Sequence, residues 1–211
     1  MALAIVVAYL VGSVPFALLL ARRWGAADLR LVGSGNVGAA NALRASGVRA
    51  GVLVAVLDIA KGAASVALAS HLSNVAAAPA VAGLSAIVGH VYPVWLRFKG
   101  GKGVATACGV FFMLTPIAVA PSFAVFLLTV WGTKYISLGS IVASVALPSI
   151  AYAAGASTAS LAVACAAAVL IIFRHRGNVV RLLDGTERRL GVPVGRPVKM
   201  ISRGGPSEEA D

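Results

Sequence analysis

The chain has 211 residues, of which 59% are apolar and only 12% are charged, against about 25% charged residues in soluble globular domains. A soluble fold could not bury that much apolar surface. The formal net charge of +11 raises nucleic acid as a partner, but the Lys and Arg residues lie between apolar runs, so they indicate membrane topology and no nucleic acid is expected. Cys108 and Cys165 lie in apolar stretches without a CxxC motif, so neither a metal site nor a disulfide framework is indicated.

The apolar runs predict an all-α, polytopic membrane helix bundle, because a bilayer core needs about 20 mostly apolar residues per spanning helix. The run nearest the N-terminus lacks the basic start of a signal peptide, so we interpret it as a retained span. Thr115-Pro116 interrupts the region from Val104 to Trp131, which could form one kinked span or two. About seven segments qualify, the fourth too short to span alone: Leu3–Ala21, Gly51–Ser70, Ala76–Pro93, Val104–Leu114, Ile117–Trp131, Leu138–Tyr152 and Thr158–Phe173.

Positive charges supply an independent test of this count, because Lys and Arg gather in short cytoplasmic loops. The stretches that follow the seven segments hold 5, 0, 3, 0, 1, 0 and 8 of these residues, the last being the tail from Arg174. This alternation predicts seven spans with the N-terminus outside and the C-terminus cytoplasmic, and it favours two segments between Val104 and Trp131. Residues 1–200 are expected to form one transmembrane domain, and the polar stretch 201–211 a disordered tail.

The first basic loop combines three glycines with hydroxyl, amide and guanidinium donors. Glycines let backbone N–H groups converge on one point, and such concavities bind anions such as phosphate. The glycines formally match GxGxxG, but no βαβ unit surrounds them, so a dinucleotide site is rejected. The alternative is a flexible linker at the membrane surface. The residues concerned are Gly33, Ser34, Gly35, Asn36, Gly38, Asn41 and Arg44.

Two ionisable residues, Asp58 and Lys61, lie in the middle of an apolar segment. Three residues apart, they share one helical face. Ionisable groups at this depth are costly, face the bundle interior and are functional candidates. The alternative is a structural ion pair that holds helices together.

A third constellation runs from Gly89-His90 to a basic glycine loop that leads directly into an apolar segment. A helix starting near Val104 would direct its N-terminal dipole and free N–H groups at this loop, giving a second anion site. Gly103 stands where a Walker P-loop requires Ser or Thr, so nucleotide hydrolysis is not expected. The alternatives are topology-setting charges and lipid headgroup contacts. The candidate residues are His90, Lys99, Gly100, Gly101, Lys102, Gly103 and Thr106.

A fourth constellation follows the last apolar segment, where His175 and Asn178 fall on one helical face and Arg181 and Glu187 come shortly after. Arg174, Arg176 and Arg181 could equally be ordinary topology-setting residues. On the predicted topology, the first, third and fourth constellations share the cytoplasmic face. Two anion-binding loops there suggest two phosphate-bearing substrates, or one substrate with two anionic groups, and the apolar bundle beside them suits an acyl chain.

From Gly12 to Glu187, with Ser137 and Ser140 as further matches, these motifs resemble those of the bacterial acyl-phosphate:glycerol-3-phosphate acyltransferase family, the PlsY family. The resemblance implies transfer of a fatty acyl group from acyl phosphate to the 1-hydroxyl of glycerol 3-phosphate, giving lysophosphatidic acid and phosphate in the first step of phospholipid synthesis. It implies no metal and no organic cofactor. It also implies a bacterial cytoplasmic membrane location, an active site that faces the cytoplasm, and the soluble enzyme that supplies acyl phosphate as a further partner.

The residue roles that the resemblance implies fall into three groups. The reacting centre would hold Ser34, Lys102, His175 and Asn178. Substrate-binding residues would be Gly33, Gly35, Asn36, Gly38, Asn41, Arg44, Lys61, His90, Lys99, Gly100, Gly101, Gly103, Thr106 and Ser140. Supporting residues would be Asp58, Ser137, Arg181 and Glu187.

Two matters remain open at this stage. The hydroxyl proton could pass to His175 or to a phosphate of the substrate. The rival functions are a transporter of small phosphorylated anions, for which no repeated glycine-broken spans are evident, and a lipid-scaffolding protein, which would not explain the Ser, Asn and His residues at the loops.

Overall fold

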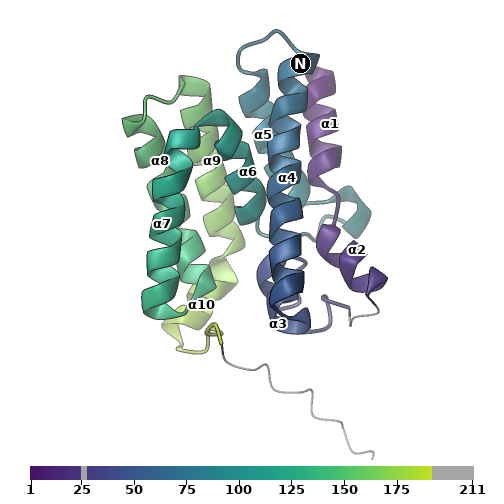
Figure 1. Cartoon of the computed structure of the whole chain (residues 1–211), viewed down its shortest axis with the longest axis vertical. Helices are drawn as coiled ribbons and strands as arrows, with labels where there is room; N and C mark the ends of the chain where they lie inside the picture. Colours follow the sequence, from purple (N-terminus) through teal and green to yellow (C-terminus); the bar gives the residue numbers. More distant parts are fainter. Residues whose placement is uncertain (25–27, 192–211) are drawn as a thin grey trace, which may run out of the picture.

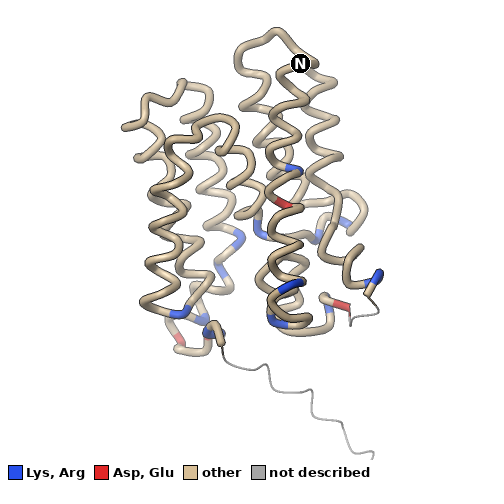
Figure 2. The backbone as a smooth tube through the Cα atoms, viewed as in Figure 1, with Lys and Arg blue, Asp and Glu red and all other residues tan. Residues whose placement is uncertain are grey.

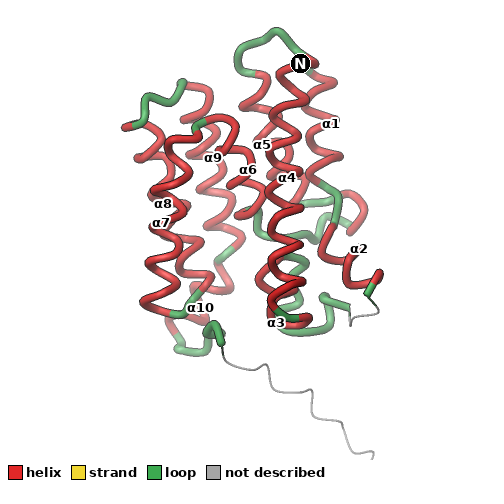
Figure 3. The backbone as a smooth tube through the Cα atoms, viewed as in Figure 1, coloured by secondary structure: helices red, strands yellow, loops and turns green. Residues whose placement is uncertain are grey.

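The computed structural model describes residues 1–24 and 28–191, and within these ranges it is helical and contains no strand (Figure 3). The expected disordered tail, 201–211, lies outside the described residues. The helices are α1 Ala2–Gly12, α2 Phe16–Arg23, α3 Ala39–Ser46, α4 Val48–Leu72, α5 Ala78–Val91, the 3-10 helix η1 Val94–Leu96, α6 Val104–Leu114, α7 Pro116–Thr133, α8 Ile136–Ala153, α9 Thr158–Arg174 and α10 Arg176–Leu183.

Within the described ranges, five helical segments are long and apolar enough to cross a membrane, and a sixth is added if α9 and α10, which meet at 54°, count as one span. Helix α6 has only 11 residues. At about 1.5 Å per residue it covers roughly 16 Å, about half of a hydrocarbon core of about 30 Å. The all-α membrane bundle is therefore confirmed, while the count of seven spans stays a prediction. The five segments are Ala2–Arg23, Val48–Leu72, Ala78–Leu96, Pro116–Thr133 and Ile136–Ala153.

The interrupted region predicted as one span or two forms two helices. Helix α6 ends at Leu114, Thr115 links the two, and α7 begins at Pro116. Proline suits the first position of a helix because its missing N–H would have no partner there. The two segments that the charge pattern favoured are thus separate helices.

The first apolar run differs from the single continuous helix expected over Leu3–Ala21. Helix α1 ends at Gly12 and α2 starts at Phe16, with Pro15 between them. Proline cannot donate to the preceding turn, so it interrupts the hydrogen-bond ladder. The carbonyl oxygen of Val14 at this break accepts a hydrogen bond from Nζ of Lys61 at 2.9 Å, so a buried cation from α4 stabilises the interruption.

Helix α4 is the centre of one half of the bundle, where it packs against α1, α3, α5 and α6 (Figure 1). Helices α7, α8 and α9 form the other half, and α5 and α6 connect the two halves through contacts with α9. The backbones of α4 and α6 approach closely, because a Cβ at Gly62 would collide with the carbonyl oxygen of Thr106 and one at Gly109 with that of Ile59. Small residues commonly permit such contacts in membrane bundles.

The charged residues of the described ranges are unevenly distributed along the bundle. Figure 2 shows Lys and Arg gathered in the half opposite the N-terminus. The junction of α9 and α10, at His175, and the described segment after α10 lie in that half too (Figure 1). The candidate residues of the first, third and fourth constellations therefore converge on one end of the bundle, as the charge pattern predicts.

Candidate active site

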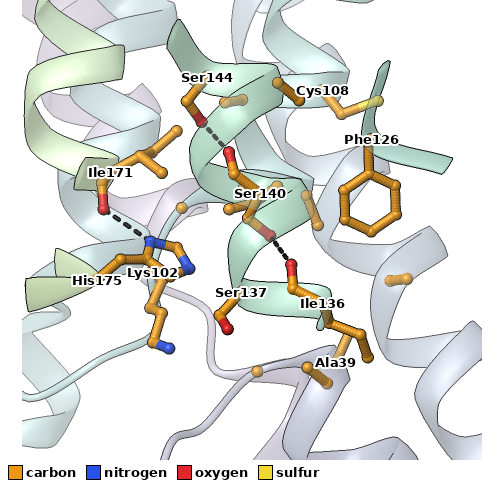
Figure 4. Close-up of a pocket in the computed structure, with 18 of the residues that line it drawn as sticks. Ala39, Lys102, Cys108, Phe126, Ile136, Ser137, Ser140, Ser144, Ile171 and His175 are labelled. Atoms are coloured by element: carbon orange, nitrogen blue, oxygen red, sulfur yellow. Dashed lines mark hydrogen bonds between the residues drawn. The ribbon is translucent and has the colours of Figure 1, made fainter. Parts of the chain in front are cut away.

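A cavity of about 300 Å³ lies between α3, α4, α6, α7, α8 and the α9–α10 junction. Its polar part is formed by Ser34, Asn36, Arg44, Lys102, Ser137, His175, Asn178, Arg181, Glu187 and Arg188. Along α8 the wall continues from Ser137 through Ser140 and Ser144 to Leu147 (Figure 4). The apolar part is formed by Ala55, Ile59, Ala107, Phe111, Val119, Phe123, Phe126, Ala143, Leu147 and Ile171. The cavity therefore joins a cationic compartment to an apolar one.

Lys102 stands at the start of α6, in the loop that ends with Gly103. Gly103 has φ +90°, a conformation that glycine adopts without strain, and it begins the helix. Nζ of Lys102 donates a 2.5 Å hydrogen bond to Oδ1 of Asn178. Burial lowers the pKa of Lys102 to about 8, against the opposing effect of the negative charge of Glu187. Lys102 is thus a cation at neutral pH, and it loses its proton within the pH range that an enzyme assay can cover.

Glu187 is a buried carboxylate that organises the polar compartment. Its Oε1 accepts hydrogen bonds from Ser137 Oγ at 2.8 Å and Asn178 Nδ2 at 2.7 Å, and its Oε2 accepts one from Arg181 Nε at 2.7 Å. Burial alone would raise the pKa of Glu187, but these bonds from Asn178, Ser137 and Arg181 lower it. Because Asn178 gives its amide nitrogen to Glu187, its oxygen faces Lys102, and the orientation of both side chains is fixed.

His175 follows the end of α9 and is only 2% exposed. Its Nδ1 lies 2.8 Å from the carbonyl oxygen of Ile171, as Figure 4 shows. A carbonyl oxygen can only accept, so this bond assigns the proton to Nδ1 and leaves Nε2 as an acceptor. In its neutral form, His175 therefore offers Nε2 to the cavity as an acceptor for a hydroxyl hydrogen.

The loop that carries Ser34 is held in shape by Asn41, which is fully buried. Nδ2 of Asn41 donates to the carbonyl oxygens of Leu29 at 2.8 Å and Val32 at 3.1 Å, and its Oδ1 accepts from the backbone N–H of Ser34 at 2.9 Å. Gly33 adopts φ +61° there. These bonds fix the backbone from which Ser34 lines the cavity.

Two helix N-termini border the polar compartment, since Gly38 to Ala40 at the start of α3 and Gly103 to Ala105 at the start of α6 line it. The positive ends of two helix dipoles therefore add to the charges of the side chains. Arg44 is among these, and its Nε is buried without a hydrogen-bond partner within the described part of the chain. This arrangement suits a ligand that carries anionic oxygens.

Comparison with known proteins shows which family has this sequence and fold. A family model described as glycerol-3-phosphate acyltransferase matches residues 2–185. The chain belongs to this acyltransferase family. The resemblance to the PlsY family is confirmed, and with it the predicted enzyme class, a membrane glycerol-3-phosphate acyltransferase. The transporter and the lipid scaffold lose their support.

Two relatives show how much of the acyltransferase chain the similarity covers. A glycerol-3-phosphate acyltransferase from Syntrophotalea carbinolica is 46% identical over 183 residues, which are 86% of this chain and 93% of that protein. Glycerol-3-phosphate acyltransferase 2 from Bacillus anthracis is 44% identical over 188 residues, which are 89% of this chain and 98% of that protein.

Solved structures agree with the acyltransferase fold. A crystal structure of PlsY, an integral membrane glycerol 3-phosphate acyltransferase in its glycerol 3-phosphate form, has a TM-score of 0.85 and 43% identity, and the match covers 90% of this chain and 94% of that chain. The lysophosphatidic acid form of PlsY gives a TM-score of 0.83 and 40% identity over the same shares.

The acyltransferase structure brings most of the sequence-predicted site residues to one cavity, although their substrate contacts stay predictions. Those that line it are Ser34, Asn36, Gly38, Asn41, Arg44, Asp58, His90, Lys102, Gly103, Ser137, Ser140, His175, Asn178, Arg181 and Glu187. Those that do not line it are Gly33, Gly35, Lys61, Lys99, Gly100, Gly101 and Thr106.

Lys61 is directed away from the acyltransferase cavity. Its Nζ lies 2.8 Å from Oδ1 of Asp58 and 2.9 Å from the carbonyl oxygen of Val14, and the same Asp58 oxygen lies 3.6 Å from Nδ1 of His90. The side chains of Lys61 and Asp58 are each 3% exposed. These contacts support the alternative of a structural ion pair, which joins α4 to α5 and to the break between α1 and α2.

Sequence reasoning missed Arg188 and the aromatic residues of the acyltransferase cavity. Phe123 and Phe126 on α7 stack with ring centroids 5.9 Å apart, and both line the cavity, as does Phe111 of α6. In a membrane helix, apolar residues that face a cavity and those that face lipid have the same composition. The sequence therefore held no pattern that could have separated them.

Proposed function

We propose that this acyltransferase moves a fatty acyl group from acyl phosphate to the 1-hydroxyl of glycerol 3-phosphate, giving lysophosphatidic acid and inorganic phosphate as the first step of phospholipid synthesis. The observation that carries the proposal is the continuity between the cationic and apolar compartments of one cavity. A phosphate fits the first compartment and a fatty acyl chain the second. The PlsY forms named for glycerol 3-phosphate and lysophosphatidic acid support this assignment.

The charge of the polar compartment suits a donor that is itself a phosphate. Arg44, Lys102 and the N-termini of α3 and α6 surround a space that receives negative charge from both glycerol 3-phosphate and the departing phosphate. Fixed donors of this kind stabilise charge as it develops in the transition state. Acyl phosphate is a mixed anhydride that is already activated, so no metal or organic cofactor is needed.

In the reaction, the 1-hydroxyl oxygen attacks the acyl carbonyl carbon, the new C–O ester bond forms, and the C–O bond to phosphate breaks with its electron pair leaving on phosphate. The hydroxyl proton ends on the released phosphate, directly or by way of His175. His175 Nε2, which can accept, holds the hydroxyl in line, and Asn178 keeps the Lys102 ammonium beside the reacting groups. Ser34 binds substrate from its fixed loop. No covalent acyl-enzyme is required.

The same proposal includes the location of the site. The gathering of Lys and Arg in the half of the bundle opposite the N-terminus supports an N-terminus outside, a C-terminus inside and an active site open to the cytoplasm of a bacterial cell. Glycerol 3-phosphate then arrives from water and the acyl chain from the bilayer. The soluble enzyme that supplies acyl phosphate would approach this face.

The test uses the purified full-length protein in a lipid mesophase, with palmitoyl phosphate and glycerol 3-phosphate, and measures phosphate release together with lysophosphatidic acid. Wild type should form both products, and Ser34→Ala and Lys102→Ala should lose them. Arg97→Ala is the matched control, because Arg97 is an exposed cation of the same loop that does not line the cavity and is not among the predicted site residues. Palmitoyl-CoA should not replace the donor. A folded wild-type preparation without product would refute the proposal.

A further inference from the structure

Arg174, the last residue of α9, reaches across the bundle to the loop that carries Lys102. Its Nη2 donates to the carbonyl oxygens of Gly100 at 3.3 Å and Gly101 at 3.4 Å. Arg174 does not line the cavity, so it cannot touch a substrate there. From the sequence alone, Arg174 could be an ordinary topology-setting cation, and the proposed mechanism does not use it.

The Gly100-Gly101 segment is held on both sides. The N–H groups of Gly100 and Gly101 donate to the carbonyl oxygens of Val91 and His90, each at 3.1 Å. The two glycines are buried, and a Cβ on Gly101 would collide with the His90 ring. Their carbonyl groups therefore face the other way, and Arg174 satisfies them, as buried backbone groups require. The N–H and C=O groups of both Gly100 and Gly101 are thus hydrogen-bonded.

The guanidinium group of Arg174 is itself held in position. It lies over the ring of Tyr92, 5.5 Å from the centroid, and the carbonyl oxygen of Tyr92 accepts a 2.8 Å bond from the hydroxyl of Tyr9. Arg176, on the other side of His175, is different, because it is exposed, lies over the Phe173 ring at 4.5 Å and donates to the Phe173 carbonyl oxygen at 3.3 Å. Of these two neighbouring cations, Arg174 is the one bonded to the loop.

We infer that Arg174 is a positioning residue for the acyl transfer step, which acts by fixing the Gly100-Gly101 peptides so that Lys102 reaches Asn178 and the reacting groups. The inference rests on the proposed function. Lys102 directly follows Gly101, so a movement of the Gly100-Gly101 peptides would move Lys102. A shift of about 1 Å in a catalytic group can cost about 100-fold in rate. Arg174 therefore controls catalysis from outside the cavity.

The charge of Arg174 gives the inference a second consequence. The charged or titratable groups around Lys102 are Glu187, Arg181, Arg44, Arg174 and His175, and the positive charge of Arg174 lowers the pKa of Lys102. Removing that charge raises this pKa, because a neighbouring cation disfavours a second one. This shift follows from the charge and not from the hydrogen bonds to the loop, so Arg174→Lys, which keeps the charge, separates the two effects.

The experiment compares Arg174→Gln, Arg174→Lys and the matched control Arg176→Gln with wild type in the palmitoyl phosphate assay. We expect Arg174→Gln to lower kcat by about 10- to 100-fold. Its KM for glycerol 3-phosphate should change by less than about threefold, which marks an effect confined to the transition state. The alkaline limb of its pH profile should move to higher pH. Arg174→Lys keeps the charge, so its limb should stay in place while kcat falls less. Arg176→Gln should match wild type.

Hydrogen exchange of the peptide that spans residues 99–106 supplies a readout that needs no activity. Exchange there should be faster in Arg174→Gln than in Arg176→Gln. The inference is overturned if kcat, the pH profile and this exchange in Arg174→Gln equal those of the control. If Arg174→Gln does not fold, Arg174→Lys becomes the test variant. The inference is then overturned if the kcat and the hydrogen exchange of Arg174→Lys equal those of wild type. A wild type without product refutes the proposed function, while the exchange comparison still tests the clamp.

Discussion

The titration of Lys102 gives the sharpest test of the site. Its pKa of about 8 lies far below the usual 10.5 because the ammonium is largely buried. The folded-state value is depressed, so the cationic form is present below pH 8 and is lost as the pH rises through it. If this cation stabilises the transferred phosphate, kcat/KM should fall above pH 8, because that parameter reports groups of the free enzyme.

The size of the fall follows from the ionised fraction. With a pKa of about 8, the cationic fraction is about 90% at pH 7 and about 10% at pH 9, so kcat/KM should drop about tenfold between them. Substrate phosphates do not interfere, since their second ionisation, near pH 6, is complete by pH 8. The arginines around the site stay charged throughout this range.

The assay follows initial phosphate release between pH 6.5 and 10, corrected for spontaneous hydrolysis of palmitoyl phosphate. Lys102→Arg is the informative variant, because a guanidinium group stays charged throughout this pH range. Its rate can be lower, but its profile should be flat where that of wild type declines. A wild-type profile that is flat to pH 10, or an identical alkaline limb in Lys102→Arg, would refute a catalytic role for the Lys102 charge.

Three further variants test the network and the packing. Glu187→Gln removes the charge that raises the pKa of Lys102, so its alkaline limb should move to lower pH and its kcat should fall; an unshifted limb would contradict the electrostatic link. Lys61→Met leaves Asp58 buried with only the more distant His90 beside it and should lower stability by about 3–5 kcal/mol in detergent unfolding, with much of the loss recovered when Asp58→Asn is added. Gly62→Ala, which forces α4 from α6, should cost about 1–3 kcal/mol, whereas Gly132→Ala, in open space, should not lower the melting temperature.

The sequence predicted the helices well because membrane insertion imposes length and composition. Each of the seven apolar segments is mostly helical, and the charge alternation separated α6 from α7 correctly. It missed the break after Gly12. Pro15 marks the break in the sequence, but the contact that stabilises it, from the ammonium group of Lys61 to the carbonyl oxygen of Val14, comes from far along the chain. Local composition could not show this contact.

The site was predictable in membership and less so in geometry. Polar residues in an apolar chain stand out, and most of those singled out line the cavity. The role of each residue could not be predicted, because Asn41 and Lys61 offer the same hydrogen-bond donors whether they bind a substrate or the protein's own backbone. The structure shows Asn41 bonded to its own loop and Lys61 to Asp58 and Val14.

On the proposed function, the shortness of α6 explains how one cavity can serve both a water-soluble and a lipid substrate. A helix of full bilayer length would begin at the water surface, where solvent screens the dipole of its N-terminus and any nearby cation. Helix α6 has 11 residues and begins beside Lys102, between the polar compartment and Phe111. There the lower dielectric strengthens attraction to phosphate, and the same burial lowers the pKa of Lys102 to about 8. On the proposed function, the altered titration of Lys102 is therefore a consequence of placing a phosphate site where an acyl chain can reach it.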